Sequence, residues 1–135
     1  MSKGSSGYYS GTSGEGRALI DEVQSRGDKI NPAEVIGITK DSSGKIVWLE
    51  KGRLDRNPSG LAHIKDAHES HFNAKGIASS DIPDFVLTAV SKGHIIGYQG
   101  KGTGRPIYEV DYQGKSYHVA VTVGNNGYIV GANPR

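Results

Sequence analysis

Hydrophobic residues follow two different periods along the chain. Up to residue 92 they recur every three or four positions in three segments, which is the spacing of one helix face. From residue 94 onward Ile, Val and Tyr alternate with polar residues, which is typical of strands. The expected helices are 15–26, 59–72 and 81–92, with a helical turn or a loop at 31–34. The expected C-terminal strands are 94–99, 106–112, 115–123 and 128–132.

The order of these elements predicts an α+β fold, because helices come first and strands last. A small hairpin interrupts the helical part, with strands at 35–39 and 45–50 joined by the turn sequence DSSG. Short loops join the last three strands, so these should form an antiparallel meander. We expect residues 1–14, rich in Gly, Ser and Tyr, to be a flexible leader, and 15–135 to be a single domain.

The segment 59–72 holds three of the five histidines in the sequence SGLAHIKDAHESHF. On a helical wheel His68 falls in the middle of the apolar stripe, His71 falls within it, and His63 lies on its margin. Imidazole takes up and releases protons near neutral pH. We therefore interpret this helix as one half of an acid–base site, with the other half on the C-terminal strands.

Two other interpretations of these histidines stay open. A histidine on an apolar helix face is most often a packed residue with a satisfied hydrogen bond, although burying two imidazoles costs desolvation and gains little apolar area. Alternatively, His68 and His71 lie three residues apart and could bind zinc. A zinc site needs a third ligand, however, and no nearby carboxylate has suitable spacing.

A basic, glycine-rich loop follows the first C-terminal strand. It reads GKGTGRP over 100–106, where alternate glycines free the backbone amides and Lys101 and Arg105 supply positive charge. Such a loop is either an anion-binding nest or an ordinary hairpin loop. The formal net charge is only +2, but residues 93–135 carry four basic and two acidic residues. This mildly basic part suits a phosphate-bearing ligand, although ordinary surface charge would give the same pattern.

Alternation along 115–123 separates a core face from a polar face. The three valines share the core side, and His118 and Thr122 share the other side. The polar side is either a ligand-binding concavity or a solvated sheet face. On the neighbouring strand, Tyr108 belongs to an aromatic face.

The amino-acid composition excludes several kinds of functional site. The chain has no cysteine, which excludes disulfides, thiolate zinc sites and a cysteine nucleophile, and no apolar run approaches membrane-spanning length. It has no acidic cluster of the kind that holds catalytic magnesium and no nucleophilic serine elbow. The remaining possibility is metal-free acid–base catalysis by side chains that lie beside Arg or Lys. RNA is a suitable substrate for such a group of histidine, Arg and Lys residues, because its 2′-hydroxyl is an internal nucleophile that an imidazole can deprotonate.

Several ordered motifs resemble a family of toxin domains. These motifs are Gly60-Leu61-x-His63-Ile64-x-x-x-His68 followed by Phe72, then Ile82-Pro83, Gly97-Tyr98-Gln99, Gly104-Arg105-Pro106-Ile107-Tyr108, and VTVGNNGYIVGANP over 121–134. Through them residues 15–135 resemble the C-terminal domains of bacterial polymorphic and contact-dependent inhibition toxins, and of some phage head proteins. These domains belong to the barnase/EndoU/colicin/RelE ribonuclease superfamily.

The resemblance implies N-terminal helices packed on a four-stranded antiparallel sheet. It also implies a metal-independent endoribonuclease, often acting on tRNA, that is delivered as part of a larger toxin into the cytoplasm of a target bacterium. A cognate immunity protein, RNA and no cofactor are implied, and without its partner the domain should be a monomer. The expected catalytic residues are His68, His63, Arg105, Thr122 and Tyr108. The expected substrate-binding residues are Lys101, His71, His118 and Asn133.

One position departs from the family pattern. Relatives often carry a basic residue before the second histidine, and this chain has Ala67 there. Either Arg105 or Lys101 holds the phosphate instead, or this copy is weakened. The departure keeps open a different class of function, a non-catalytic nucleic-acid-binding or structural module associated with phage heads.

Overall fold

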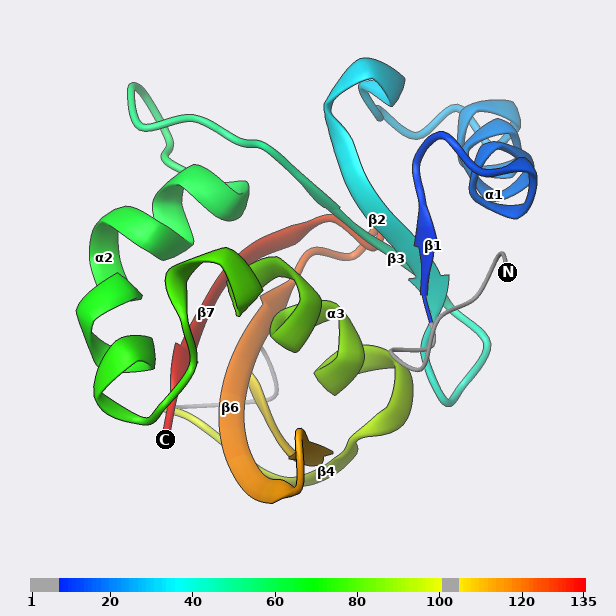
Figure 1. Ribbon diagram of the computed structural model, residues 1–135. Helices are drawn as coiled ribbons and strands as arrows, with labels where there is room; N and C mark the ends of the chain where they lie inside the picture. Colours follow the sequence, from blue (N-terminus) through cyan, green and yellow to red (C-terminus); the bar gives the residue numbers. More distant parts are fainter. Residues whose placement is uncertain (1–7, 101–104) are drawn as a thin grey trace.

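Three helices and two antiparallel sheets make up the described residues, 8–100 and 105–135, of the computed structural model (Figure 1). The helices are α1 (Gly14–Ser25), α2 (Gly60–Ala74) and α3 (Ile82–Lys92), with short 3-10 turns at Pro32–Glu34 and Ser79–Asp81. The strands are β1 (Tyr9–Ser10), β2 (Val35–Lys40), β3 (Ile46–Glu50), β4 (His94–Tyr98), β5 (Pro106–Tyr112), β6 (Lys115–Val123) and β7 (Ile129–Pro134). The strand orders are β1-β2-β3 and β4-β5-β6-β7. The α+β prediction with a four-stranded antiparallel sheet is confirmed.

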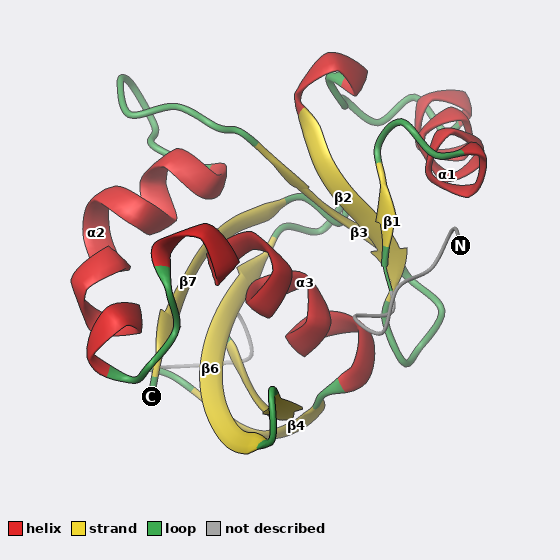
Figure 2. Ribbon diagram, viewed as in Figure 1, coloured by secondary structure: helices red, strands yellow, loops and turns green. Residues whose placement is uncertain are grey.

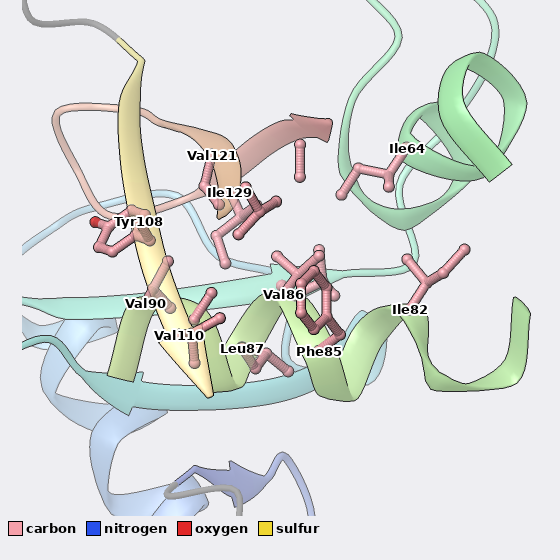
Figure 3. Packing of buried hydrophobic residues seen from close by; sticks show 14 of the residues in the cluster. Ile64, Ile82, Phe85, Val86, Leu87, Val90, Tyr108, Val110, Val121 and Ile129 are labelled. Atoms are coloured by element: carbon pink, nitrogen blue, oxygen red, sulfur yellow. The ribbon is translucent and has the colours of Figure 1, made fainter. Parts of the chain in front are cut away.

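Helix α3 lies between the two sheets and forms the centre of the main core. Seven of its eleven residues are buried, and it contacts β2 and β3 on one side and β5 and β6 on the other. A helix that is apolar on most of its surface can be covered from both sides in this way. Phe85 packs edge-on against the rings of Phe72 and Tyr112, and Figure 3 shows its neighbours in the cluster.

The three-stranded sheet has a second, smaller core on its other face. Helix α1 packs there, with Ile20 and Val23 against Ile38 and Trp48 (Figure 2). The predicted hairpin corresponds to β2 and β3, and β1 adds a third strand to it. Residues 8–14 therefore belong to the folded unit rather than to the expected leader, and residues 1–7 lie outside the described residues. Ser13 begins α1 by accepting a hydrogen bond from the Gly16 amide.

Helix α2 lies along the edge strand β7 (Figure 1). Ile64 and Phe72 are fully buried, whereas much of the rest of the helix surface remains open. Ser59 occupies the expected N-cap position, but its side chain makes no capping bond. The Ser59 hydroxyl instead lies 2.8 Å from the Tyr128 hydroxyl and connects the start of α2 to the segment before β7.

The four-stranded sheet has an inner face toward α3 and an outer face. The inner face carries Tyr108, Val110, Tyr112, Val119 and Val121, all of them buried. Successive residues point to opposite faces, so the outer face carries Glu109, His118, Thr122 and Asn133. The expected separation of the strand 115–123 into a valine side and a polar side is thereby confirmed.

Hydrogen bonds cross the outer face between the two ends of the sheet. Gln99, which follows β4, accepts from Asn133 Nδ2 at 3.1 Å and from Arg135 Nη1 at 2.7 Å. Both donors are on or beside β7, three strands away in the order. The sheet must therefore curl toward its outer side. Ala120, which pairs with Asn133, is only 1% exposed although it belongs to this outer face.

None of the described helices has the length and apolar character needed to cross a membrane.

Candidate functional site

His63 lies against the outer side of β7. A Cβ atom placed on Gly131 would be 3.5 Å from His63 Cδ2 and 3.9 Å from His63 Nε2, so glycine leaves the space that the imidazole fills. Gly131 is paired with Thr122 on β6, and paired residues in an antiparallel sheet share one face. The His63 ring therefore lies on the same side of the sheet as Thr122.

The other two histidines of α2 contact each other. His68 Nδ1 and His71 Nδ1 are 3.0 Å apart, a hydrogen bond in which one ring donates and the other accepts. His68 is half-buried and His71 is exposed, so of the two positions that the helical wheel allowed, the core or a cleft beside it, neither histidine occupies the core. The reason is the edge position of α2, which leaves only the stripe through Ile64 and Phe72 covered.

The environment of His68 lowers its pKa from the ordinary value. Partial burial is the main cause, followed by electrostatic repulsion from His71, His63 and Arg105. Arg105 is the last and smallest of these causes. At neutral pH His68 is therefore a neutral imidazole surrounded by cationic or potentially cationic groups.

Thr122 lies at the centre of this part of the outer face. It pairs with Gly131 of β7, the residue that His63 contacts. Arg105 immediately precedes β5, whose residue Ile107 pairs with Ala120 of β6, two positions before Thr122. We call Arg105, Thr122 and Gly131 the Arg-Thr-Gly row.

Two of the residues expected to be catalytic, His63 and Thr122, lie on one face of the sheet, since His63 contacts Gly131 and Gly131 pairs with Thr122. Two others, His68 and Arg105, are connected by the electrostatic influence of Arg105 on the pKa of His68. An imidazole pair, a hydroxyl and a guanidinium on one surface can bind an anion and move protons beside it.

Tyr108 is the exception and corrects the sequence-based assignment. Its side chain is only 7% exposed and packs in the main core on the inner face. Burial, with smaller contributions from Asp41 and Tyr98, raises its pKa to about 12. Because Tyr108 alternates with the outer-face residues of β5, its hydroxyl lies on the wrong side of the sheet to join Thr122.

The expected substrate-binding residues are spread more widely. His118 belongs to a second polar group, in which Glu109 Oε2 is 3.1 Å from His118 Nε2 and Glu109 Oε1 is 3.1 Å from His94 Nε2. Hydrogen bonding from His118 is the main cause that lowers the pKa of Glu109. Asn133 is engaged with Gln99, and this bridge separates the second group from the Arg-Thr-Gly row. Lys101 lies outside the described residues.

Sequence reasoning assigned no role to two residues that shape this surface. Gly131 makes room for His63, and Gln99 closes the outer face against Asn133 and Arg135. The only signal for Gly131 was its expected position on the last strand, opposite the strand that carries Thr122. Gln99 had no comparable signal, because its partners Asn133 and Arg135 lie far away in the sequence. For zinc, the described residues contain no group of three or more His, Asp or Glu side chains placed to hold a metal ion, so His68 and His71 have no third ligand.

No protein-family model matches the chain, and no curated protein is significantly similar to it. The function is therefore argued from the geometry of the site and from the motifs.

Proposed function

We propose that this chain is a metal-independent endoribonuclease toxin domain that cleaves RNA, with tRNA as its target. The observation that supports the proposal is a histidine of α2, His63, against Gly131 on the face of the sheet that carries Thr122, together with the electrostatic effect of His63 and Arg105 on His68 of the same helix. These groups come from distant parts of the chain, and no packing requirement explains why half-buried and exposed imidazoles should gather beside a guanidinium.

The pKa of His68 suggests how the roles divide. An imidazole with a lowered pKa is neutral at pH 7 and can accept a proton, so we assign His68 as the general base for the ribose 2′-hydroxyl. Its Nδ1 is engaged by His71, which leaves Nε2 to face the substrate. His63 then acts as the general acid and protonates the leaving 5′-oxygen.

Arg105 and Thr122 stabilise the reacting phosphate. The new bond joins the 2′-oxygen to phosphorus as the bond to the 5′-oxygen breaks, giving a 2′,3′-cyclic phosphate and a 5′-hydroxyl. Charge builds on the non-bridging oxygens, where the Arg105 guanidinium and the Thr122 hydroxyl can donate hydrogen bonds. DNA lacks the nucleophile and should not be cut.

The biological setting proposed here follows from the toxin-like motifs. On that basis the domain is delivered as the C-terminal part of a larger toxin, acts in the cytoplasm of a competing bacterium, and is neutralised by a cognate immunity protein. Until it meets that partner we expect it to be a monomer.

Incubation with total RNA in excess EDTA tests the enzymatic proposal. We expect discrete fragments with cyclic phosphate and 5′-hydroxyl ends, because no metal takes part. Arg105→Ala should reduce the rate about tenfold or more by removing the phosphate contact, whereas Arg17→Ala, at an exposed position on α1, should not. Intact RNA at micromolar enzyme, or activity abolished by EDTA, would refute the mechanism.

A non-catalytic RNA-binding module is the second candidate, favoured by one observation. Ala67, which stands where related domains often carry a cation, is exposed on α2 and leaves that position uncharged. The same incubation separates the two candidates, since gel retardation of intact RNA would support the binding module.

A further inference from the structure

The four-stranded sheet has one covered edge and one open edge. Its strand order puts β7 at one end and β4 at the other (Figure 1). Helix α2 packs along β7, and α3 packs on β5 and β6. Four of the five residues of β4 are exposed. An outer strand without a cover can pair with a further strand, so β4 is the edge at which another chain can join this sheet.

Large apolar side chains gather on this open edge. Ile95 and Ile96 are each 47% exposed, and Tyr98 is 46% exposed. They are three of the four exposed large hydrophobic residues in the described part of the chain, and the fourth, Leu54, lies in the loop between β3 and α2. Single exposed apolar residues are common on protein surfaces, whereas three on one short strand indicate an interaction site.

Two of these side chains extend the inner face of the sheet. Ile95 pairs with Tyr108, which is buried on the inner face, and Tyr98 pairs with Pro106, two positions before Tyr108. Paired residues share one face, so Ile95 and Tyr98 lie on the inner side as well. The apolar layer that α3 covers on β5 and β6 therefore continues onto β4, where it is exposed.

The backbone of β4 presents hydrogen-bonding groups in the same direction. The Gln99 N–H donates to the Arg105 carbonyl oxygen at 2.8 Å. Hydrogen-bonded and non-hydrogen-bonded pairs alternate in an antiparallel ladder, so the preceding pair, Tyr98 with Pro106, is not hydrogen-bonded. Proline suits that position because it has no N–H. The N–H and C=O of Tyr98 therefore point away from β5, toward the open edge, where an added strand can bond to them.

Charge favours a different, acidic protein over a second copy of this chain. Residues 93–135, which form the sheet, carry four basic and two acidic residues. One of the two carboxylates, that of Glu109, is already engaged by His94 and His118. Two copies joined at β4 would bring like charges together, whereas a partner with carboxylates would be attracted. The bulge between Ile95 and Gly97 also interrupts the regular edge that indiscriminate strand pairing needs.

We propose that β4 is a docking edge for a β-strand of an acidic protein partner. The partner strand extends the antiparallel sheet, covers Ile95, Ile96 and Tyr98 with its own apolar side chains, and bonds to the outward backbone groups of Tyr98. Main-chain hydrogen bonds and apolar burial supply the affinity, and carboxylates at the ends of the strand supply the preference for this basic sheet.

The docking edge ends beside a residue of the candidate site. The backbone bond between Gln99 and Arg105 places the end of β4 next to Arg105. A Cβ on Gly97 would have no atom within 4 Å, so open space remains there for a side chain of the partner. A carboxylate entering at this end can compete with a phosphate for Arg105. Identifying the partner with the neutralising immunity protein rests on the proposed function, whereas the docking edge itself does not.

Peptide binding tests the docking edge without any cleavage. A blocked synthetic peptide, in which Val and Thr alternate between terminal glutamates, is titrated into the full chain and followed by NMR. The amide signals of Ile95, Ile96 and Tyr98 should shift, and the Tyr98 amide should exchange its hydrogen more slowly because it gains an acceptor. The same peptide with terminal lysines should bind about fivefold or more weakly. Equal binding of both peptides, or no shift on β4 at millimolar peptide, would overturn the proposal.

A matched pair of aspartate variants sharpens the test. Ile96→Asp removes an apolar contact and adds a charge that repels the acidic peptide, so binding should weaken about tenfold or more. Leu54→Asp makes the same change at the exposed hydrophobic residue away from β4 and should bind as the unmodified chain does. If Ile96→Asp does not fold, the NMR map on the unmodified chain decides. Self-association of the unmodified chain in sedimentation, abolished by Ile96→Asp, would assign the edge to a second copy and overturn the acidic partner.

RNA cleavage then separates this inference from the nuclease proposal. Cleavage that falls as the acidic peptide saturates β4 supports both, because the peptide carboxylate competes for Arg105. Peptide binding to β4 without any cleavage by the unbound chain would leave the docking edge standing and refute the nuclease. Cleavage by a chain whose β4 signals do not respond to the peptide would refute the docking edge alone.

Discussion

The two faces of the four-stranded sheet come from the same strands and have opposite chemistry. On β6, Val119 and Val121 are fully buried against α3, whereas His118 and Thr122, one position away, lie on the outer side with polar neighbours. The inner face holds the domain together, and the outer face carries the groups that can act on a ligand. Adjacent residues of one strand therefore have different roles, because one packs in the core and the next lies on the face that can contact a ligand.

The outer face is itself divided into two polar groups. At one end the Arg-Thr-Gly row meets the histidines of α2, and at the other Glu109 joins His94 and His118. The bridge between Gln99 and Asn133 runs between them. The first group has cationic and imidazole side chains without a carboxylate partner among its members, whereas the second is neutralised internally. Only the first suits a phosphate.

An aspartate substituted on either face of β6 should give the largest difference in stability between two variants. Val121→Asp buries an unpaired carboxylate in the main core, so we expect the variant not to fold. Thr122→Asp, at the adjacent position, should fold because it lies on the outer face, but it should repel the phosphate and abolish cleavage. Circular dichroism melts compare the two. A folded Val121→Asp protein would contradict the assignment of the inner face.

Substitution of His68 should affect RNA cleavage far more than substitution of the buried Tyr108. His68→Ala should reduce RNA cleavage by about a hundredfold or more, because it removes the general base, while the melting temperature stays close to that of the unmodified chain. Tyr108→Phe should leave the cleavage rate unchanged, because the hydroxyl is on the inner side. Initial rates on a purified tRNA provide the measurement. A His68→Ala variant as active as the original would disprove its assigned role.

The pKa of His68 should respond to its neighbour. His71→Ala removes one of the causes that lower the pKa, so the midpoint for His68 should move upward toward about 6.5. NMR titration of the ring protons measures it, and the acid limb of the pH–rate profile should move in the same direction. An unchanged midpoint would show that His71 is not one of the causes that lower the pKa of His68.

The same group also couples folding to pH. Because the pKa of His68 is lower in the folded state, the unfolded chain binds the proton more tightly. The free energy of unfolding should therefore be at its full value above about pH 6.5 and should fall as the pH drops toward the folded-state pKa. His68→Asn should lose this part of the dependence, as chemical denaturation at several pH values can show.

A substitution in the second polar group, formed by Glu109, His94 and His118, should have the smallest effect on stability. Glu109→Gln removes a carboxylate that contacts two histidines, but exposed ion pairs contribute little to stability. We expect no measurable change in melting temperature at pH 8. Near pH 5 a small decrease at most is expected, because the lowered pKa of Glu109 keeps its carboxylate ionised there. A large loss at either pH would mean that this group supports the fold.

The local periodicity of hydrophobic residues was sufficient to predict most helices and strands, but not which segments they pair with or pack against. The three helices and the seven-residue and nine-residue strands β5 and β6 agree with the expected segments closely. The two-residue strand β1 was missed, because Tyr9–Ser10 has no periodicity of its own and is a strand only through pairing with β2. The helical wheel placed His68 and His71 toward the core or a cleft beside it. It could not choose between these two positions, because it does not show that α2 lies at an edge and is covered on one narrow stripe.

Alternation and helical spacing alone determined that this protein has helices followed by strands, a valine face opposite a polar face, and a helix rich in histidine, because these properties depend on neighbours within a few residues. The tertiary structure decided which of these groups meet. It placed Gly131 against His63, Thr122 opposite Gly131, and Tyr108 on the inner side of the sheet. Such contacts depend on strand order, on register and on the curl of the sheet, and these arise from packing between segments far apart in the chain.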